Sequence, residues 1–419
     1  MNTLRVLYNG WGERWHLGTL ADDGHGIVFE YSNEAIARGR QLSPLHLPLP
    51  RAGAVPTTFV GKPCFYGLPG FIADALPDGW GMLLMDRALQ RAGRNPRTVS
   101  VLERLAIVGD RAMGALSFEP AQEDGLNSEV LELKTIAQEI ANFHNEAQQP
   151  LPLALDAQLK HLMQLGGSPQ GARPKVLASF DTSTQQLTSG LPLSGGSGCA
   201  TPWLIKFPAQ GEHREVCAIE ELYARIARHG GMDMPRSQWF DLGATHSAFG
   251  VERFDRSVQP DGSLQRIPMI SLSAYLDVDH RLPALDYEAV LLATLHITGD
   301  QREVLKAFER CVLNVLLHNR DDHSKNFAFL MNPQGRWQLS PVFDLTYSFG
   351  PGGEHATSVA GQGKDITQAH LLQVAKAGGV AVKTAQERVE YWSSVVEDGF
   401  KMAKDLPIRK NTLKMLHKV

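Results

Sequence analysis

The chain has 419 residues, of which 43% are hydrophobic and 21% charged, and its net charge is −4 at pH 7. These ordinary values indicate a soluble globular protein and exclude a strongly basic nucleic-acid-binding class. No apolar run approaches the ~18 residues of a membrane span, and the first residues lack the apolar core of a signal peptide. The four cysteines lie far apart without a C-x-x-C pair, so we expect reduced thiols and a cytoplasmic protein.

The first part of the chain predicts short strands followed by helices. Residues 16–31 (HLGTLADDGHGIVFEY) favour two strands around the turn-forming DDGHG. A proline-rich stretch follows, and residues 71–93 (FIADALPDGWGMLLMDRALQRAG) begin a helical region. The polar, turn-rich residues 119–130 are typical of a boundary between domains.

Residues 165–255 favour strands again. A glycine-rich turn leads into a strand at residues 165–181, and residues 201–208 (TPWLIKFP) predict a second strand that carries one lysine. The apolar spacing in residues 214–231 predicts a helix that stops at Gly230. Two further strands are expected within residues 237–256, separated by the turn ATH.

After about Asp255 the pattern becomes mostly helical. A β-rich half followed by a helical half predicts an α+β fold with two lobes and a cleft between them. We therefore expect three parts: a β-rich N-terminal subdomain at residues 1–118, a β-rich lobe with the glycine-rich loop at 119–255, and a helical lobe at 256–419.

Residues 318–329 (HNRDDHSKNFAF) concentrate polar groups between an apolar helix and a predicted hairpin. Phosphoryl transfer needs a carboxylate near the acceptor hydroxyl, oxygen ligands for Mg²⁺ and cations on the phosphates. Asp321 would serve as the base, with Asn326 on the same loop and Asp344 just after the hairpin as Mg²⁺ ligands. The alternative is that these Asp and Asn side chains only cap a turn.

Three upstream features suit the same chemistry. Lys206 lies within the apolar strand WLIKF, where it either snorkels at an edge or contacts a charged ligand. Glu220 or Glu221 on the following helix could pair with it, and Glu220, beside the buried-face Ile219, is the preferred partner. The segment GGSPQGARPK is not a P-loop, but it could cover phosphates with its backbone N–H groups and with Lys175.

Five segments in this order resemble the HipA family of serine/threonine protein kinases, the toxins of bacterial toxin–antitoxin pairs: GGSPQGARPK, WLIKFP, VERFDR, NRDDHSKNFAF and LSPVFDLTYS. The likeness covers nearly the whole chain, since LSPLHLPLP and GFIADALPDGW resemble that family's small N-terminal subdomain, and residues 358–379 its C-terminal helices. The resemblance implies a bilobal protein-kinase-like fold that binds ATP and Mg²⁺.

The resemblance also implies residue roles. Asp321 would be the catalytic base, Asn326 and Asp344 the metal ligands, and Lys206 a phosphate contact. Ser168 matches the serine whose autophosphorylation shuts the kinase off, because a dianion on a phosphate-binding loop would repel ATP. The remaining nucleotide contacts would come from the covering loop, the adenine hinge and the catalytic loop: Gln170, Gly171, Ala172, Arg173, Pro174, Lys175, Glu252, Arg253, Phe254, His323, Ser324 and Lys325.

The family's partner is a helix-turn-helix antitoxin of the HipB type that binds operator DNA, so DNA would be contacted only through that complex. Some members phosphorylate aminoacyl-tRNA synthetases, which makes a host protein the expected substrate. One departure is that members often carry Glu-x-Glu after the lysine strand, whereas this chain has Ala218 at the first position.

Two rival functions remain open. A small-molecule kinase could use the same loop chemistry, and a non-catalytic antitoxin- or DNA-binding regulator could keep the fold without turnover. The presence of Lys206, Asp321, Asn326 and Asp344 together argues against the regulator. His318 and His323 make a poor zinc site, because they are five residues apart with no nearby cysteine. His323 is expected to brace the catalytic loop instead.

Overall fold

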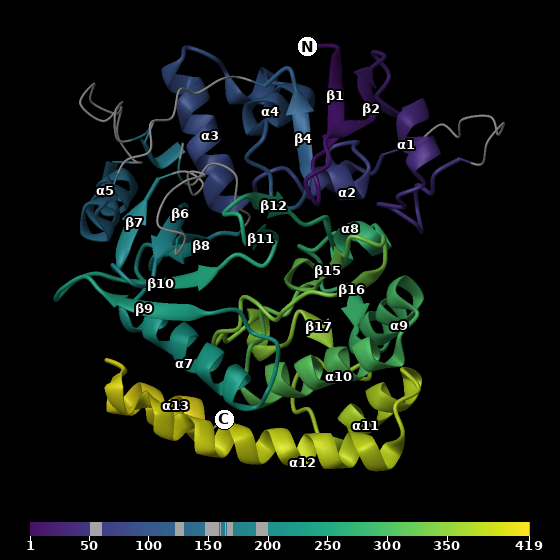
Figure 1. Ribbon diagram of the computed structural model, residues 1–419. Coiled ribbons are helices and arrows are strands. Elements are labelled where there is room, and N and C mark those ends of the chain that lie inside the picture. The colour runs from purple at the N-terminus through teal and green to yellow at the C-terminus, as the bar shows by residue number, and fades with distance from the viewer. Residues whose placement is uncertain are drawn as a thin grey trace. The chain divides into compact units, whose positions relative to one another are not determined.

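The computed structural model describes residues 1–50, 61–121, 130–146, 159, 161–163, 165, 171–189 and 200–418 (Figure 1). The chain divides into two compact units. The first comprises residues 1–42, 47–217 and 237–269, and the second comprises residues 43–46, 218–236 and 270–419. Within the described ranges, no helix combines the length and the apolar character that a membrane crossing requires.

The first unit begins with an antiparallel four-stranded sheet in the order β3-β2-β1-β4. Its strands are β1 (Thr3–Tyr8), β2 (Trp15–Asp22), β3 (Ile27–Tyr31) and β4 (Leu116–Glu119). The hairpin expected at residues 16–31 is confirmed, and Asp23 Oδ1 accepts the N–H groups of His25 and Gly26 in its turn. The accompanying helices are α1 (Asn33–Arg38), α2 (Gly70–Ala73), α3 (Gly79–Arg91) and α4 (Val101–Val108), with 3₁₀ turns at Pro63–Phe65 and Pro96–Thr98.

A six-stranded sheet in the order β5-β7-β6-β8-β10-β9 forms the rest of the first unit's framework. Its strands are β5 (Val130–Leu131), β6 (Lys175–Asp181), β7 (Gln186–Thr188), β8 (Ala200–Lys206), β9 (Ser237–Asp241) and β10 (Ser247–Glu252). The strands expected within residues 165–181, 201–208 and 237–256 are confirmed as β6, β8, β9 and β10. The sequence interpretation missed α5 (Leu133–Glu146) and the short hairpin of β11 (Arg256–Val258) and β12 (Leu264–Arg266).

Within the first unit, a buried cluster of charged residues connects the hairpin of β11 and β12 to residues 110–117, at the start of β4. Asp255 is fully buried and accepts hydrogen bonds from Arg253 at 2.9 and 2.8 Å, from Arg256 at 2.6 Å and from the N–H of Gly114 at 2.8 Å. Arg266 donates to the carbonyls of Gly114, Ala112, Leu116 and Asp110 and to Ser117. Buried charges are stable only when paired and hydrogen-bonded in this way.

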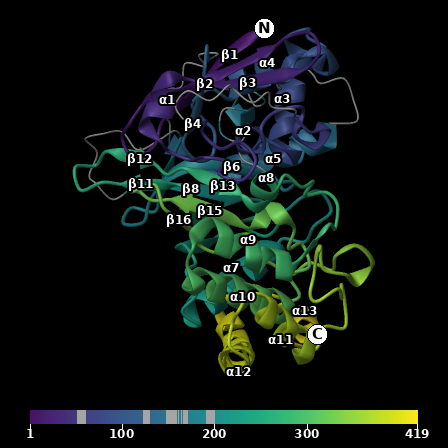
Figure 2. The same ribbon diagram turned by 90° about the vertical axis from the view of Figure 1, so that its right-hand side faces the viewer.

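The second unit is mainly helical, as expected. Its helices are the greater part of α7 (Glu215–His229), α8 (Leu272–Leu276), α9 (Tyr287–Thr298), α10 (Gln301–Leu316), α11 (Gln368–Ala377), α12 (Val382–Gly399) and α13 (Lys410–Lys418), with 3₁₀ turns at Ser324–Asn326, Pro351–Gly353 and Phe400–Asp405. Two small sheets join β13 (Met269–Ser271), β15 (Ala328–Met331) and β16 (Trp337–Leu339), and β14 (Leu285–Asp286) with β17 (Thr357–Ser358). Both views show α12 running alongside α10 and α11 (Figures 1 and 2).

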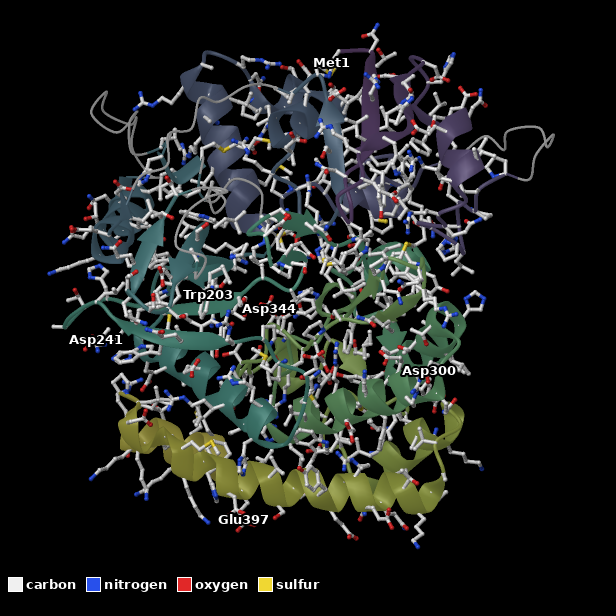
Figure 3. All side chains as sticks on the ribbon, in the orientation of Figure 1. Met1, Trp203, Asp241, Asp300, Asp344 and Glu397 are labelled. Carbon is white, nitrogen blue, oxygen red and sulfur yellow. The ribbon has the colours of Figure 1, made fainter. Side chains whose placement is uncertain are left out.

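Helix α10 delivers the polar loop singled out in the sequence. It starts at the N-cap Asp300, labelled in Figure 3, whose carboxylate accepts the N–H of Arg302 at 2.9 Å. One face of the helix is buried, and its apolar members include Val304, Phe308, Cys311 and Val312. This packing fixes the direction in which the chain leaves the helix at Leu317. Cys217 and Cys311 are both buried and carry thiol groups.

Candidate active site

The loop after α10 begins with a sharp reversal of the backbone. His318 has a φ of 50°, and its N–H and that of Asn319 bond back to Val315 and Asn314 at the end of the helix. The loop then runs into the hairpin of β15 and β16, which is antiparallel and turns at residues 332–336. The predicted order of helix, polar loop and hairpin is therefore confirmed.

Two adjacent aspartates of this loop have opposite environments. The Asp321 side chain is 64% exposed, whereas Asp322 is fully buried. An exposed carboxylate can approach a substrate hydroxyl, while a buried one with several donors serves structure. Asp321 is thus the member of the pair that suits a catalytic base.

Asn326 is tied to the backbone of Asp321. Its Nδ2 donates to the carbonyl of Asp321 at 2.6 Å, and its N–H donates to the carbonyl of His323 at 2.8 Å. His323 Nδ1 accepts the N–H of Lys325 at 3.3 Å and so caps the short 3₁₀ turn, which agrees with its expected bracing role. Because the amide nitrogen faces Asp321, the Asn326 Oδ1 is the end of the amide that can face a cation.

Asp344 follows the hairpin and lies half-buried in the second unit, where Figure 3 labels it. Its φ of 51° is the left-handed conformation, which is uncommon for a residue with a side chain and often marks a functional position. Its carbonyl accepts Asn319 Nδ2 at 3.3 Å, so the polar loop and the residue after the hairpin are joined through Asn319.

The oxygen chemistry of these side chains fits Mg²⁺. Asn326 supplies an amide oxygen and Asp344 a carboxylate, and Mg²⁺ takes few ligands from protein and completes its shell with water and phosphate oxygens. Among the residues that the structure describes, no three His, Cys, Asp or Glu side chains gather as a metal-binding group. A site of one amide and one carboxylate needs no such group.

A buried polar network beneath the loop was missed by the sequence interpretation. Asp322 Oδ2 accepts Tyr287 Oη at 2.8 Å and lies 2.8 Å from His355 Nδ1, and its Oδ1 accepts the N–H of Thr357 at 3.2 Å. Burial and the neighbouring Asp322 raise the pKa of Tyr287 well above its usual value, so the hydroxyl remains a donor. These partners are more than 30 positions from Asp322 in the chain, and no local sequence pattern announces them.

The first unit places the two predicted lysines side by side. Lys175 of β6 and Lys206 of β8 are direct partners in the antiparallel register, and both are buried. Direct partners project from the same face of a sheet, and like charges in this position destabilise it unless anions lie nearby. Lys206 Nζ also lies 5.9 Å from the ring centre of Phe249, its register partner in β10. This face of the sheet therefore carries two buried lysine side chains next to each other.

The described end of the glycine-rich loop is fixed by the start of α3. Asp78 at the N-cap of α3 accepts the N–H of Gly171, and Trp80 donates its N–H to the Gly171 carbonyl at 3.1 Å. Gly171 has a φ of 101°, and a Cβ added there would collide with Lys175 Nζ. The loop backbone and the Lys175 ammonium are consequently close together. Ser168 and Gln170 lie outside the described residues.

Some of the other predicted nucleotide-contacting residues already make ion pairs or hydrogen bonds within the protein. Arg173 pairs with Glu212 at 2.9 Å. The Arg253 guanidinium donates to Asp255, and the Arg253 backbone N–H donates to the Pro202 carbonyl. An adenine base would therefore have to be contacted by other groups of residues 252–254. On α7, Glu221 pairs with Arg225 at 2.8 Å and with Arg228 at 3.5 Å. Glu220 therefore stays the preferred partner of Lys206, and this pairing is a prediction.

The structure thus brings together Asp321, Asn326 and, through Asn319, Asp344 in the second unit, and Lys175, Lys206 and Gly171 in the first. Ala172 is exposed and Pro174 buried in the loop before β6, while Ser324 is buried and Lys325 half-buried in the 3₁₀ turn of the second unit. Asp78, Asp322, Tyr287 and His355 are the further residues that the sequence interpretation missed.

Comparison with known protein families matches two stretches of the chain. Residues 5–119 match the HipA N-terminal domain, and residues 167–399 match the HipA-like C-terminal domain. A protein of Sinorhizobium fredii with the provisional name of kinase Y4mE is 27% identical over 368 residues, which cover 82% of this chain and 77% of that protein.

A solved structure has the same fold. It is a chain from the Shewanella oneidensis MR-1 toxin–antitoxin complex of HipA, HipB and operator DNA, with a TM-score of 0.69 and 16% identity, covering 98% of this chain and 94% of that chain. The expected α+β fold is confirmed by this match.

Proposed function

The chain belongs to the HipA family, and from this premise we propose that it is an ATP- and Mg²⁺-dependent protein serine/threonine kinase. The name of the Sinorhizobium relative supports kinase activity. The observation that carries the proposal is the turn in which the Asn326 amide is tied to the Asp321 carbonyl while the Asp321 carboxylate stays exposed.

In this proposal Asp321 accepts the proton of the attacking hydroxyl. The exposure of Asp321 lets a side chain of a protein substrate reach its carboxylate. The hydrogen bond from Asn326 Nδ2 to the Asp321 carbonyl fixes the position of Asp321. Asn326 Oδ1 and the Asp344 carboxylate would hold Mg²⁺, which when bound neutralises charge on the phosphates. Asp344 is kept in place through its carbonyl by Asn319.

Lys206 and Lys175 would contact the phosphates of the same ATP. Their direct pairing across β6 and β8 concentrates two positive charges on one face, which suits a triphosphate better than a single carboxylate. Gly171 would contribute its backbone to the loop that covers the nucleotide, and residues 252–254 would form the adenine hinge.

Regulation and partners extend the proposal. Ser168 would be an inhibitory autophosphorylation site, because a phosphate beside the Lys175 loop would compete with ATP for the same charges. The solved relative was crystallised with HipB and operator DNA, which supports a helix-turn-helix antitoxin as the partner here and DNA contact through that complex. The substrate would be a host protein, with aminoacyl-tRNA synthetases as the first candidates, and the cytoplasm is the expected location.

The first experiment is transfer of labelled phosphate from ATP. The protein is incubated with labelled ATP, Mg²⁺ and a cell lysate, beside its Asp321→Asn variant. We expect label on the protein itself and on a protein substrate, reduced on the order of 10²-fold in the variant, the usual scale for a lost general base. Asp322 is not a suitable control because it is buried, so the exposed Asp261→Asn serves as the matched exchange.

Other outcomes decide between the alternatives. Label on metabolites alone would indicate a small-molecule kinase, and no label at all would indicate a non-catalytic regulator. Equal labelling by the wild-type protein and Asp321→Asn would remove Asp321 from the role of base.

A further inference from the structure

The segment that follows Asp344 is attached to the polar loop at successive points. The N–H of Ser348 donates to the carbonyl of His318, and the N–H of Ala356 donates to the carbonyl of Arg320, each at 3.1 Å. Thr357 makes two bonds to one residue: its N–H to Asp322 Oδ1 at 3.2 Å and its hydroxyl to the Asp322 carbonyl at 2.6 Å. All these residues lie in the second unit, and the contacts span the whole of residues 348–357.

The Asp322 carboxylate is the centre of this attachment. It is fully buried, and Tyr287, His355 and the backbone of Thr357 all converge on its two oxygens. Thr357 is itself 1% exposed and His355 6% exposed, so the interaction is shielded from water. A buried carboxylate with several donors forms strong bonds, and losing its charge would weaken the bonds to these donors.

The same network reaches Asp344. Tyr287 Oη accepts Asn314 Nδ2 at 2.8 Å, and Asn314 Oδ1 accepts Asn319 Nδ2 at 3.0 Å. Asn319 Nδ2 also donates to the Asp344 carbonyl at 3.3 Å. Asp322 is therefore linked by an unbroken series of hydrogen bonds to the backbone carbonyl of Asp344.

We infer that Asp322 is a positioning residue that holds residues 348–358 in their working conformation without phosphorylation of that segment. In many kinases the segment after the second metal ligand is ordered by a phosphate that pairs with arginines. Here the negative charge is supplied by a buried carboxylate of the loop itself. The inference rests on the proposed kinase function, because the segment is expected to order the site for transfer.

The test compares two variants with one control. Asp322→Asn keeps the shape and removes the charge, and Tyr287→Phe removes only the hydroxyl that bonds Asp322. We expect faster amide hydrogen exchange at Ser348, Ala356 and Thr357 in both variants. We also expect kcat to fall about tenfold while the KM for ATP stays within about twofold, the scale of one lost bond to a charged group.

Tyr275→Phe is the matched control, because Tyr275 is also a buried tyrosine of the second unit, but its hydroxyl bonds His296. It should change neither the exchange of residues 348–358 nor kcat. If Asp322→Asn fails to fold, Thr357→Val and Thr357→Ser provide the same comparison, with the serine restoring the hydroxyl, the slow exchange and the kcat that the valine loses.

Two results would overturn the inference. One is unchanged exchange and unchanged kcat in Asp322→Asn and Tyr287→Phe. The other is an active wild-type protein with phosphate on residues 345–361 in mass spectrometry, whose activity a phosphatase abolishes. The exchange measurement needs no turnover, so if the wild-type protein transfers no phosphate, the kinase proposal fails while the anchoring by Asp322 is still decided.

Discussion

At the scale of single residues, Asp255 is the buried carboxylate on which the first unit's charge cluster is built. Burial acts to raise the pKa of Asp255, but the charges of Arg253 and Arg256 outweigh it and hold the pKa well below the usual value. A carboxylate with a lowered pKa contributes stability that is present above its unfolded pKa, near 4, and that is lost as the pH falls through the folded value.

Asp255→Asn should therefore destabilise the first unit at neutral pH. It would leave Arg253 and Arg256 buried without their counter-charge, a change that typically costs about 3–5 kcal/mol. The measurement is the urea unfolding transition followed by tryptophan fluorescence at several pH values. The difference between the wild-type protein and the variant should shrink as the pH is lowered below about 4, because the Asp255 carboxyl then takes up a proton in the unfolded chain while it stays charged in the folded protein.

Asp261→Asn is the control, since Asp261 lies in the exposed turn between β11 and β12, and its unfolding transition should match that of the wild-type protein. An Asp255→Asn protein as stable as the wild-type protein at pH 7, or a difference independent of pH, would contradict the importance of the buried charge.

The adjacent Asp321 and Asp322 show how far residue types alone can take an assignment. The sequence interpretation chose Asp321 by its spacing to Asn326, and the exposed Asp321 side chain suits that choice. It could not find the role of Asp322, because the burial of this carboxylate depends on Tyr287, His355 and Thr357, which lie 33–35 positions away. Contacts between residues far apart in the chain decide whether such a carboxylate is buried, and a short sequence motif carries no information about those contacts.

At the scale of elements, the start of α3 supports the glycine-rich loop. Gly79 has a φ of 43°, and a Cβ there would lie 2.7 Å from Ala172 Cα and 2.7 Å from the Gly171 carbonyl oxygen. Both neighbours are backbone atoms, which cannot move aside as a side chain can. Any residue larger than glycine at position 79 must displace the loop that leads to Lys175.

Gly79→Ala should weaken ATP binding about tenfold, since overpacking against backbone costs about 1–3 kcal/mol and each 1.4 kcal/mol is tenfold in affinity. Isothermal titration with ATP and Mg²⁺ measures the effect. Gly93→Ala is the matched control, because Gly93 follows the same helix with a φ of 73° but has no atom within 4 Å of the added Cβ.

The positive φ strains the alanine in both the Gly79→Ala and the Gly93→Ala variant. The two variants therefore differ only in the contact that the Gly79→Ala side chain makes with the glycine-rich loop. Equal affinities of the two variants for ATP would show that the α3 contact does not position the loop.

Elements with a strong periodic pattern were predicted and are confirmed, such as β8, α7 and the hairpin of β15 and β16. The hairpin of β11 and β12 was missed because each strand has three residues, too few for alternation to stand out. Its strands are held by Arg256 and Arg266, whose buried bonds to residues 110–117 only a folded structure displays.

At the scale of the whole molecule, the fold is retained where identity is low. The Shewanella chain shares 16% of its residues with this chain but covers 98% of it. The match to both HipA domains spans the two parts that the sequence interpretation separated by residues 119–130. The boundaries expected at residues 118 and 255 stay predictions.

The candidate site residues belong to both compact units. Lys175, Lys206 and Gly171 lie in the first unit, and Asp321, Asn326 and Asp344 lie in the second. The central claim of the proposed function is that these two sets act on one ATP. When several groups stabilise one transition state together, removing any one of them abolishes most of the rate enhancement that they supply jointly. The losses of activity caused by their separate mutations are therefore far from additive.

The most direct test is a double-mutant cycle of Lys206→Met and Asp344→Asn, measured as kcat/KM for phosphate transfer from ATP in the presence of Mg²⁺. We expect each single variant to lose on the order of 10²-fold, and the double variant to lose little more than either one. A loss in the double variant equal to the product of the two single losses, or a single variant with wild-type activity, would contradict the claim that both units serve the same nucleotide.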